Sequence, residues 1–332
     1  MVMKSPVVRK TISSVVDKNT DTLLGQKIED SGHRFRLGSV IGSGTYGQLR
    51  QGFNLNNNNQ LVAIKLENKR HSQLDTEYRF YKEINDRIRA KDPNLKITDG
   101  FARIDYFCHW RQYKVLVFEM LGRNLGEAFV ACGQQFTLKT VVYIFLQLLQ
   151  RIETVHTIGI VHRDIKPENF VLGCPGTRLQ NCIHIIDFGL AAFYINPDTK
   201  RHIEMQKKDS LLGTARYISI NGHLGKELSR RDDLESIGYL MMYFVKQGKL
   251  PWSGLKAPTD KDRFEMICEC KRATPIETLC NGYPEQFAEY LRKVRCLRFK
   301  QTPDYTSLKN IFIKLFHREG CDDDGQYDWN SI

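Results

Sequence analysis

One run of residues and one tripeptide downstream of it carry side chains that could act on a phosphoryl group. The run His162–Asn169 reads HRDIKPEN, and Asp187 begins a D-F-G tripeptide after the apolar stretch CIHII. Asp164 can orient a hydroxyl group and take its proton, and Lys166 can neutralise charge on the phosphate. Asn169 and Asp187 offer oxygen ligands suited to Mg²⁺. These residue types predict phosphoryl transfer, which depends mainly on alignment and charge neutralisation.

A lysine further upstream needs anionic partners. Lys65 ends the sequence V-A-I-K, whose apolar neighbours place it on a half-buried strand where an unpaired ammonium is costly. Nucleotide phosphates can supply one partner, and Glu77, on the helix expected after this strand, can supply the other. A lone V-A-I-K can equally be a strand lysine that faces solvent. The order of the motifs along the chain favours the nucleotide.

A glycine cluster precedes the lysine. Gly42–Gly47 reads GSGTYG, and its glycines would let backbone amides approach an anion closely. By itself this pattern could be an ordinary glycine hairpin, or a dinucleotide fingerprint if a helix followed it. A strand follows instead, which favours a hairpin that covers phosphates.

The elements that must position these residues change in character along the chain. From Phe35 the stretches FRLGSVI, LRQGF and LVAIKL predict an antiparallel meander, and FARIDYF and KVLVFEM predict two more strands. A helix with Ser72 as its N-cap is expected between these two groups. After Leu121 helices dominate, including a long amphipathic helix over residues 138–155 that Gly159 closes. Short strands are expected near residues 160 and 185.

These motifs and their order resemble those of protein kinases. The resemblance implies an α+β, bilobal protein-kinase fold with two lobes that share a cleft. We expect a flexible tail over residues 1–32, a small β-rich N-lobe over 33–121 and a larger helical C-lobe over 122–332. The segment 83–114 is longer than expected.

Residues beyond the D-F-G tripeptide resemble the casein kinase 1 family in particular. Most kinases close the activation segment with Ala-Pro-Glu, whereas Ser219–Asn221 reads S-I-N, the hallmark of this family. The stretches HLG, SRRDDLES, LPW, TPIE, GYP and TPDY, further along the chain, also look like this family. The resemblance covers about Phe35 to Trp329. Relatives with long regulatory tails continue past residue 332, so we expect no tail-based autoinhibition.

The resemblance implies roles for further residues. Phe118 would be the gatekeeper, and Glu119 and Leu121 would meet adenine through backbone groups. Val171 and Ile186 would flank the adenine. For Phe118, Val171 and Ile186, plain core packing is the alternative interpretation. The implied ATP-binding set is Ile41, Gly42, Ser43, Gly44, Gly47, Leu49, Ala63, Lys65, Phe118, Glu119, Leu121, Val171 and Ile186. Asp233 would anchor the catalytic loop, and Thr214 would tie the activation segment to the catalytic aspartate.

A site for an anion is also implied. Arg216 stands where many kinases have a glutamate, so the sign of the charge beside the substrate groove is inverted. Gly254 and Arg263 would complete a forked site suited to phosphate, and Lys207 and Lys208 could add longer-range attraction. We therefore expect acidic or phosphate-primed protein substrates. An internal salt bridge of Arg216 and a solvated Arg263 are the alternative interpretation.

Composition sets the remaining expectations. With 332 residues, a net charge of +11 and no apolar run long enough for a membrane span, the chain is expected to be a cytoplasmic or nuclear protein. The kinase resemblance implies ATP and Mg²⁺ as its ligands, and we expect a monomer. The nine scattered cysteines favour reduced thiols over zinc. Nucleic acid is not expected, because the basic residues form no block.

Two other classes of function fit the sequence less well. A pseudokinase scaffold would usually lack Lys65, Asp164 or Asp187, and all three are present. A nucleic-acid-binding module would want a docking helix or an aromatic platform with clustered cations, and neither is evident.

Overall fold

The computed structural model of the chain describes residues 21–44, 47–91, 100–207 and 212–331, without the side chains of residues 88–91. It divides into two compact units. The first unit comprises residues 1–79 and 102–120, and the second comprises residues 80–101 and 121–332.

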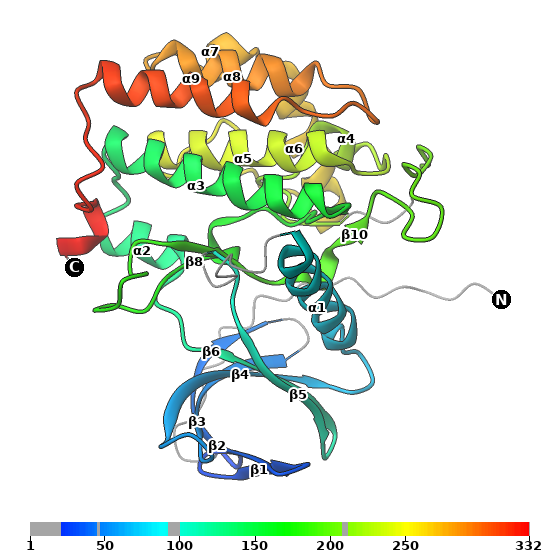
Figure 1. Cartoon of the computed structure of the whole chain (residues 1–332). Helices are drawn as coiled ribbons and strands as arrows, with labels where there is room; N and C mark the ends of the chain where they lie inside the picture. The colour runs from blue at the N-terminus through cyan, green and yellow to red at the C-terminus, as the bar shows by residue number, and fades with distance from the viewer. Residues whose placement is uncertain (1–20, 45–46, 92–99, 208–211, 332) are drawn as a thin grey trace. The chain divides into compact units, whose positions relative to one another are not determined.

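The first unit is built on one antiparallel sheet (Figure 1). Its strand order is β1-β2-β3-β4-β6-β5, and the expected meander and the two later strands are all present. Apolar side chains from alternate strand positions form its core, among them Phe35, Ile64 and Val117. The strands are β1 (Lys27–Asp30), β2 (His33–Ser43), β3 (Gly47–Asn54), β4 (Gln60–Asn68), β5 (Ile104–Trp110) and β6 (Tyr113–Glu119).

Strand β1 corrects the expectation of a flexible tail over residues 1–32, at least for the part that the structure describes. Every residue of β1 pairs with β2, and the Ile28 side chain is only 1% exposed in the core of the sheet. Alternating apolar residues did not indicate this strand, because Ile28 is the one apolar residue in KIED. Residues 1–20 lie outside the described ranges.

Helix α1 (Leu74–Lys91) follows β4. Ser72 was expected to be its N-cap, and its hydroxyl does accept a hydrogen bond from the Leu74 amide at 3.1 Å, although the helix begins two residues later. The segment 83–114, which seemed long, is largely accounted for by the end of α1, by β5 and by the start of β6. Residues 92–99 of this segment are outside the described part.

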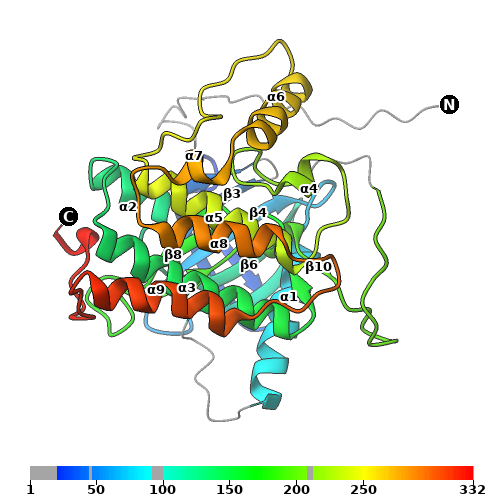
Figure 2. The same ribbon diagram turned by 90° about the horizontal axis from the view of Figure 1, so that it is seen from above.

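The second unit is mainly helical. Helices α3, α5, α8 and α9 lie side by side (Figures 1 and 2). Gly159, at φ +87°, ends α3 as predicted. The helices are α2 (Leu125–Ala131), α3 (Leu138–Thr157), α4 (Ile220–His223), α5 (Arg230–Val245), α6 (Asp260–Ala273), α7 (Ile276–Cys280), α8 (Glu285–Arg295) and α9 (Tyr305–Arg318), with short 3-10 helices η1 (Pro167–Asn169), η2 (Phe188–Leu190) and η3 (Asp328–Ser331).

Two short strand pairs place the motifs of the second unit. Strand β8 (Phe170–Leu172) pairs with β9 (Ile183–Ile185), so Asn169 and Asp187 lie near the same end of this hairpin. Strand β7 (Ile160–Val161), which precedes the H-R-D motif, pairs with β10 (Ala192–Phe193), which follows the D-F-G tripeptide. This pairing brings the two motif segments together. A β-rich unit and a helical unit confirm the predicted α+β, bilobal kinase class.

Candidate active site

The glycine-rich turn joins β2 and β3 in the first unit. Gly42 pairs with Leu49, Ser43 pairs with Gln48, and the Gly44 amide donates to the Gly47 carbonyl at 2.9 Å. A Cβ on Gly47 would lie 1.9 Å from the Leu66 carbonyl oxygen, so only glycine fits there. Strands flank the cluster on both sides, which agrees with a hairpin and not with a dinucleotide fingerprint. Thr45 and Tyr46, at its tip, are not among the described residues.

Lys65 makes the ion pair that its sequence context predicted. Its Nζ lies 2.6 Å from Glu77 Oε2 on α1, and the Glu77 side chain is buried. The carboxylate of Glu67 is a second partner, with its Oε1 3.7 Å from the same Nζ. The sequence did not indicate this second partner. The Gln73 amide holds Glu67 by donating to it at 2.8 Å. Two buried carboxylates therefore fix the Lys65 ammonium on β4.

The residues expected around adenine lie on defined elements of each unit. Ala63 on β4 pairs with the gatekeeper candidate Phe118 on β6, and both are buried. Glu119 ends β6, and its amide donates to the Arg103 carbonyl at 3.0 Å. The remaining side chains range from exposed to buried: Ile41 is exposed, Leu49, Leu121 and Ile186 are half-buried, and Val171 is buried on β8.

Asp164 is the centre of a hydrogen-bonded group in the second unit. Its carboxylate accepts from Thr214 Oγ1 at 2.9 Å and from Lys166 Nζ at 2.5 Å. The Asn169 side-chain amide donates to the Asp164 carbonyl at 2.9 Å. The expected link between Thr214 and Asp164 is therefore present. Gly213 makes this approach possible, because a Cβ there would lie 2.8 Å from the Arg163 carbonyl oxygen.

Asp233 holds the backbone of the H-R-D motif, as predicted. It lies on α5, is 2% exposed, and accepts from the His162 amide at 2.8 Å and the Arg163 amide at 2.9 Å. His156 Nε2 is a third partner at 2.9 Å. Burial raises the pKa of the Asp233 carboxyl, but hydrogen bonds from His156 and His162 outweigh it, so the pKa lies below its ordinary value.

Asn169 and Asp187 fit the requirements of a magnesium ion. The Ile186 amide donates to the Asn169 carbonyl at 2.9 Å, so Asp187 follows directly beside Asn169. The Asn169 amide nitrogen is committed to Asp164, which leaves its oxygen as the atom available to a cation. One carboxylate and one amide oxygen suit Mg²⁺, which is usually held by few protein ligands together with substrate phosphates. The described residues contain no cluster of three or more His, Cys, Asp or Glu side chains that could hold a metal ion.

Packing fixes the backbone at Asp187. Its φ is +64°, a left-handed conformation that is uncommon for a residue other than glycine and often found at functional sites. The next residue, Phe188, is fully buried, and its ring meets those of Tyr81 and His162 at centroid distances of 5.0 and 5.1 Å. The Asp187 amide donates to the Tyr81 hydroxyl at 3.3 Å.

The S-I-N motif has a direct structural role. The Ser219 hydroxyl donates to Asp232 Oδ1 at 2.7 Å and accepts from the Gly222 amide at 3.0 Å, so it also caps α4. Asn221 donates to the same Asp232 oxygen at 3.1 Å. Burial raises the pKa of the Asp232 carboxyl to about 6. The motif thus ties the end of the activation segment to helix α5.

A lysine that the sequence analysis missed supports the same segment. Lys271 on α6 is 0% exposed, and its Nζ donates to the Ala215 carbonyl at 2.9 Å and the Ile218 carbonyl at 2.6 Å. It also lies 4.7 Å from the Tyr239 ring centroid. The spacing along α6 could have predicted this burial, because Lys271 is four residues after Ile267 and therefore lies on the same, buried face of the helix.

The contacts given for the described residues do not join the three residues of the expected anion site to one another. The Arg216 guanidinium lies over the Tyr243 ring at 5.2 Å, and its carbonyl accepts from Trp252 Nε1 at 2.9 Å. Gly254, two residues after Trp252, is exposed with φ +76°. Arg263 is exposed on α6, and no contact within the described ranges joins it to Arg216. Lys207 is exposed, and Lys208 is outside those ranges.

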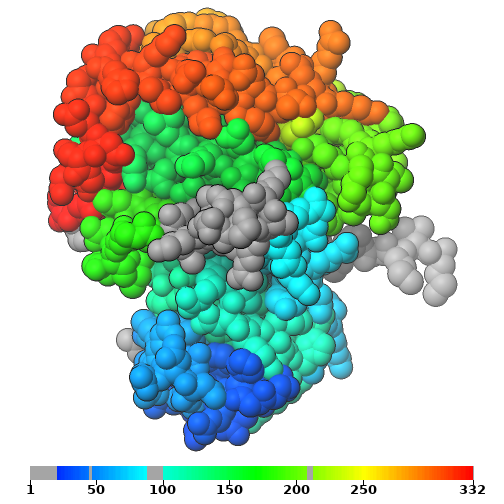
Figure 3. Space-filling view, viewed as in Figure 1, coloured from blue at the N-terminus to red at the C-terminus, as the bar shows by residue number. Residues whose placement is uncertain are grey.

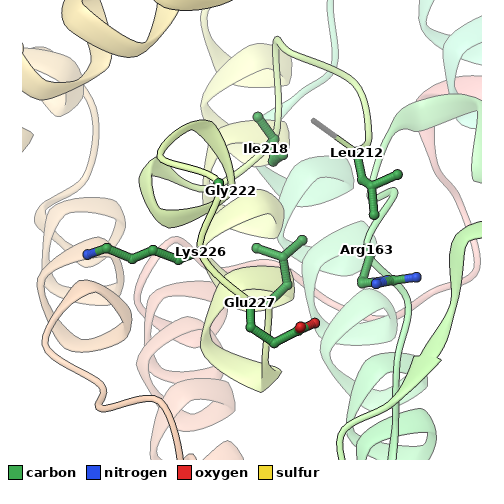
Figure 4. Close-up of a pocket in the computed structure, with 8 residues that line it drawn as sticks. Arg163, Leu212, Ile218, Gly222, Lys226 and Glu227 are labelled. Carbon is green, nitrogen blue, oxygen red and sulfur yellow. The ribbon is translucent and has the colours of Figure 1, made fainter. Parts of the chain in front are cut away.

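Arg163 has internal partners near a small pocket. Its φ is +69°, and its Nε donates to the Leu190 carbonyl at 2.6 Å. Burial lowers the pKa of its guanidinium, and the negative charges of Glu227 and Asp233 oppose this effect. Arg163 and the buried Glu227 both line a pocket of about 10 Å³, shown in Figure 4.

The comparisons with known proteins agree with this arrangement. The family model described as "Protein kinase domain" matches residues 35–306. Three curated relatives come from Schizosaccharomyces pombe. The chain is 44% identical to Casein kinase I homolog 2 over 300 residues, which is 90% of this chain and 66% of the relative. It is 43% identical to Casein kinase I homolog 1 (91% of this chain, 65% of the relative) and 43% identical to homolog 3 (91% and 66%).

The chain spans about two thirds of the length of these relatives. No helix in the described part of the chain combines the length and the apolar character that crossing a membrane requires. The kinase-domain match covers most of the chain, and the identity to the casein kinase I homologs extends over nearly all of it. The chain therefore belongs to the protein kinase family and, within it, to the casein kinase 1 family.

Proposed function

We propose that this chain is an active serine/threonine protein kinase that transfers the terminal phosphate of ATP to protein hydroxyls. The observation that carries the proposal is the set of contacts around Asp164, whose carboxylate meets Lys166 and Thr214 beside the pair Asn169 and Asp187. A scaffold that had lost catalysis would have no need for this complete set.

Each residue has a defined task in the proposed reaction. Asp164 orients the substrate hydroxyl and accepts its proton as the hydroxyl oxygen bonds to the γ-phosphorus and ADP leaves. Lys166 neutralises charge on the transferred group, and Lys65, held by Glu77, binds the other phosphates. Asn169 and Asp187 would hold Mg²⁺, which, when bound, neutralises charge on the phosphates.

The proposal is tested by incubating the purified chain with radiolabelled ATP, Mg²⁺ and casein. We expect phosphate on serine or threonine of the casein. A folded protein that binds ATP without transferring phosphate would instead be a pseudokinase scaffold.

We further propose that the substrates carry an acidic or phosphorylated residue a few positions N-terminal to the target hydroxyl. Arg216 is held in place by its stacking on Tyr243 and by the bond from Trp252 to its carbonyl. Gly254, two residues after Trp252, is exposed, and so is Arg263 on α6. Together these groups could bind the oxygens of a phosphate.

The double substitution Arg216→Ala with Arg263→Ala should remove most of this preference. A hydrogen bond to a charged group contributes about 1.5–3 kcal/mol, so each arginine should change discrimination by roughly tenfold to a hundredfold. The measurement is kcat/KM on paired peptides with and without the upstream phosphate. Arg272→Ala, an exposed arginine on the same helix, is the matched control. Equal kcat/KM for the two peptides in the wild type would contradict the proposal.

Activity should not require phosphorylation of the activation segment. In many kinases the arginine before the catalytic aspartate pairs with a phosphate on this segment. Here Arg163 has the Leu190 carbonyl and the negative charge of Glu227 instead. Of the two nearby hydroxyls, Thr214 is engaged with Asp164, and Ser210 lies outside the described ranges.

The test is a preparation shown by intact mass to carry no phosphate, which should be fully active. Glu227→Gln, which removes the internal negative charge, should lower kcat about tenfold, as expected for the loss of one charged contact. A wild type that stays inactive until an upstream kinase is added would refute this expectation.

A further inference from the structure

Arg50 is a fully buried cation three residues after Gly47, the last residue of the glycine-rich turn. It lies on β3 and is 1% exposed. Its Nε donates to the Gly38 carbonyl at 2.9 Å, Nη1 donates to Gln48 Oε1 at 2.9 Å, and Nη2 donates to the Asp21 carboxylate. A guanidinium stays charged at all ordinary pH values, so its burial requires a counter-charge. Asp21 supplies that charge.

The structure holds Asp21 firmly in this position. The second oxygen of its carboxylate accepts from the Leu23 amide at 3.2 Å. The chain after it joins the sheet, since the Gly25 amide donates to the Leu37 carbonyl at 2.8 Å. Leu23 packs against the apolar core of the first unit. The hydrogen bond from Arg50 lowers the pKa of the Asp21 carboxyl.

Arg50 acts where β2 is irregular. The pairing of β2 with β3 shifts register between Leu37 and Val40 and again between Val40 and Gly42. Gly38, whose carbonyl Arg50 binds, lies in the first shift. Such bulges bend a strand and redirect the chain beyond them, and here that part of the chain is the glycine-rich turn. Because Gln48 is the first residue after Gly47, the guanidinium holds both arms of that turn.

We propose that Asp21 and Arg50 form a clip that fixes the β2 bulge and so positions the glycine-rich turn for nucleotide phosphates. The proposal rests on the proposed function, since it assigns these residues a part in ATP binding. Neither residue touches the turn's glycines in the described contacts, so both are positioning residues. Figure 3 shows the start of the described chain, in dark blue, at the surface of the first unit.

Asp21→Ala in the full chain tests the clip. With its counter-charge gone, Arg50 should leave its buried position, and Gly38 and Gln48 should lose the hydrogen bonds that it donates to them. We expect the Kd and the KM for ATP to rise about tenfold, equivalent to one hydrogen bond to a charged group, with kcat changed less than about twofold. Hydrogen exchange of the amides over residues 42–47 should become faster. Asp21→Asn, which keeps an acceptor but loses the charge, should give an intermediate effect.

Asp30→Ala is the matched control. Asp30 belongs to the same N-terminal segment, and its carboxylate accepts from the Tyr106 hydroxyl at 2.7 Å without contacting Arg50. It should leave the Kd for ATP and the exchange of residues 42–47 unchanged. An Asp21→Ala protein that melts earlier but binds ATP like the wild type, with unchanged exchange, would overturn the clip and leave only a structural role. A wild type that binds ATP but transfers no phosphate would instead refute the proposed kinase activity, while the Kd and exchange still report on the clip.

Discussion

Replacing Asp187 by asparagine is expected to lower kcat by about 10²- to 10³-fold, the usual loss when one preorganised electrostatic contact to a transition state is removed. Asp187 is the only carboxylate of the proposed metal pair, and its partner Asn169 carries no charge. The substitution keeps the size of the side chain but removes the negative charge that Mg²⁺ needs. Phosphate transfer to casein at saturating Mg²⁺ is the measurement.

The fold should survive this change. The Tyr81 hydroxyl accepts from the Asp187 amide, and the Tyr81 ring meets the Phe188 ring edge to face. Neither contact involves the charge of the Asp187 carboxylate. The melting temperature should therefore stay within a few degrees of the wild-type value. Asp198→Asn is the control, because it is the same substitution at an exposed position in the segment that follows the D-F-G tripeptide. This variant should retain full activity. Turnover near the wild-type rate in Asp187→Asn would reject Asp187 as a metal ligand.

The parts of the site that the sequence predicted are those in which residue type determines the partner. Lys65 on a half-buried strand needs a carboxylate, and Glu77 on the next helix is within reach. Thr214 and Asp164 were expected together from the kinase motifs, and their side chains do meet. The strand and helix pattern was also predictable, because apolar periodicity and glycine positions determine where elements begin and end.

The residues that sequence reasoning missed depend on contacts between distant positions. Lys271 can be buried because two carbonyl oxygens of the activation segment, more than fifty residues earlier in the chain, accept hydrogen bonds from its ammonium. Asp21 stands in a polar stretch that reads as a tail, and only the fold shows that it meets Arg50. In each case a charged side chain in the sequence predicts solvent exposure by default. The buried partner that reverses this expectation is supplied by tertiary structure.

Asp233→Asn should impair both stability and catalysis, because the Asp233 carboxylate accepts hydrogen bonds from three donors at the H-R-D motif and the helix before it. The amides of His162 and Arg163 and Nε2 of His156 all donate to it. Burial lowers the pKa of His156, so its imidazole is neutral, and its Nδ1 can accept from the Tyr305 hydroxyl at 2.6 Å while Nε2–H donates to Asp233. An asparagine has a single acceptor oxygen and would leave at least one buried donor without a partner.

We expect Asp233→Asn to lower the free energy of unfolding by about 2–4 kcal/mol and kcat by roughly tenfold to a hundredfold, because Asp164 follows directly on the two amides that lose their support. Denaturant unfolding and casein phosphorylation measure the two effects. Tyr305→Phe, which removes only the outer link to His156, is the matched control and should cost about 1 kcal/mol or less. Because the folded pKa of Asp233 lies below the ordinary carboxyl value, its stabilisation is present at neutral pH and is lost as the pH falls below that value. The difference in unfolding free energy between wild type and Asp233→Asn should therefore shrink in acid. A difference that persists unchanged through the acid range would show that the charge of Asp233 is not what holds the loop.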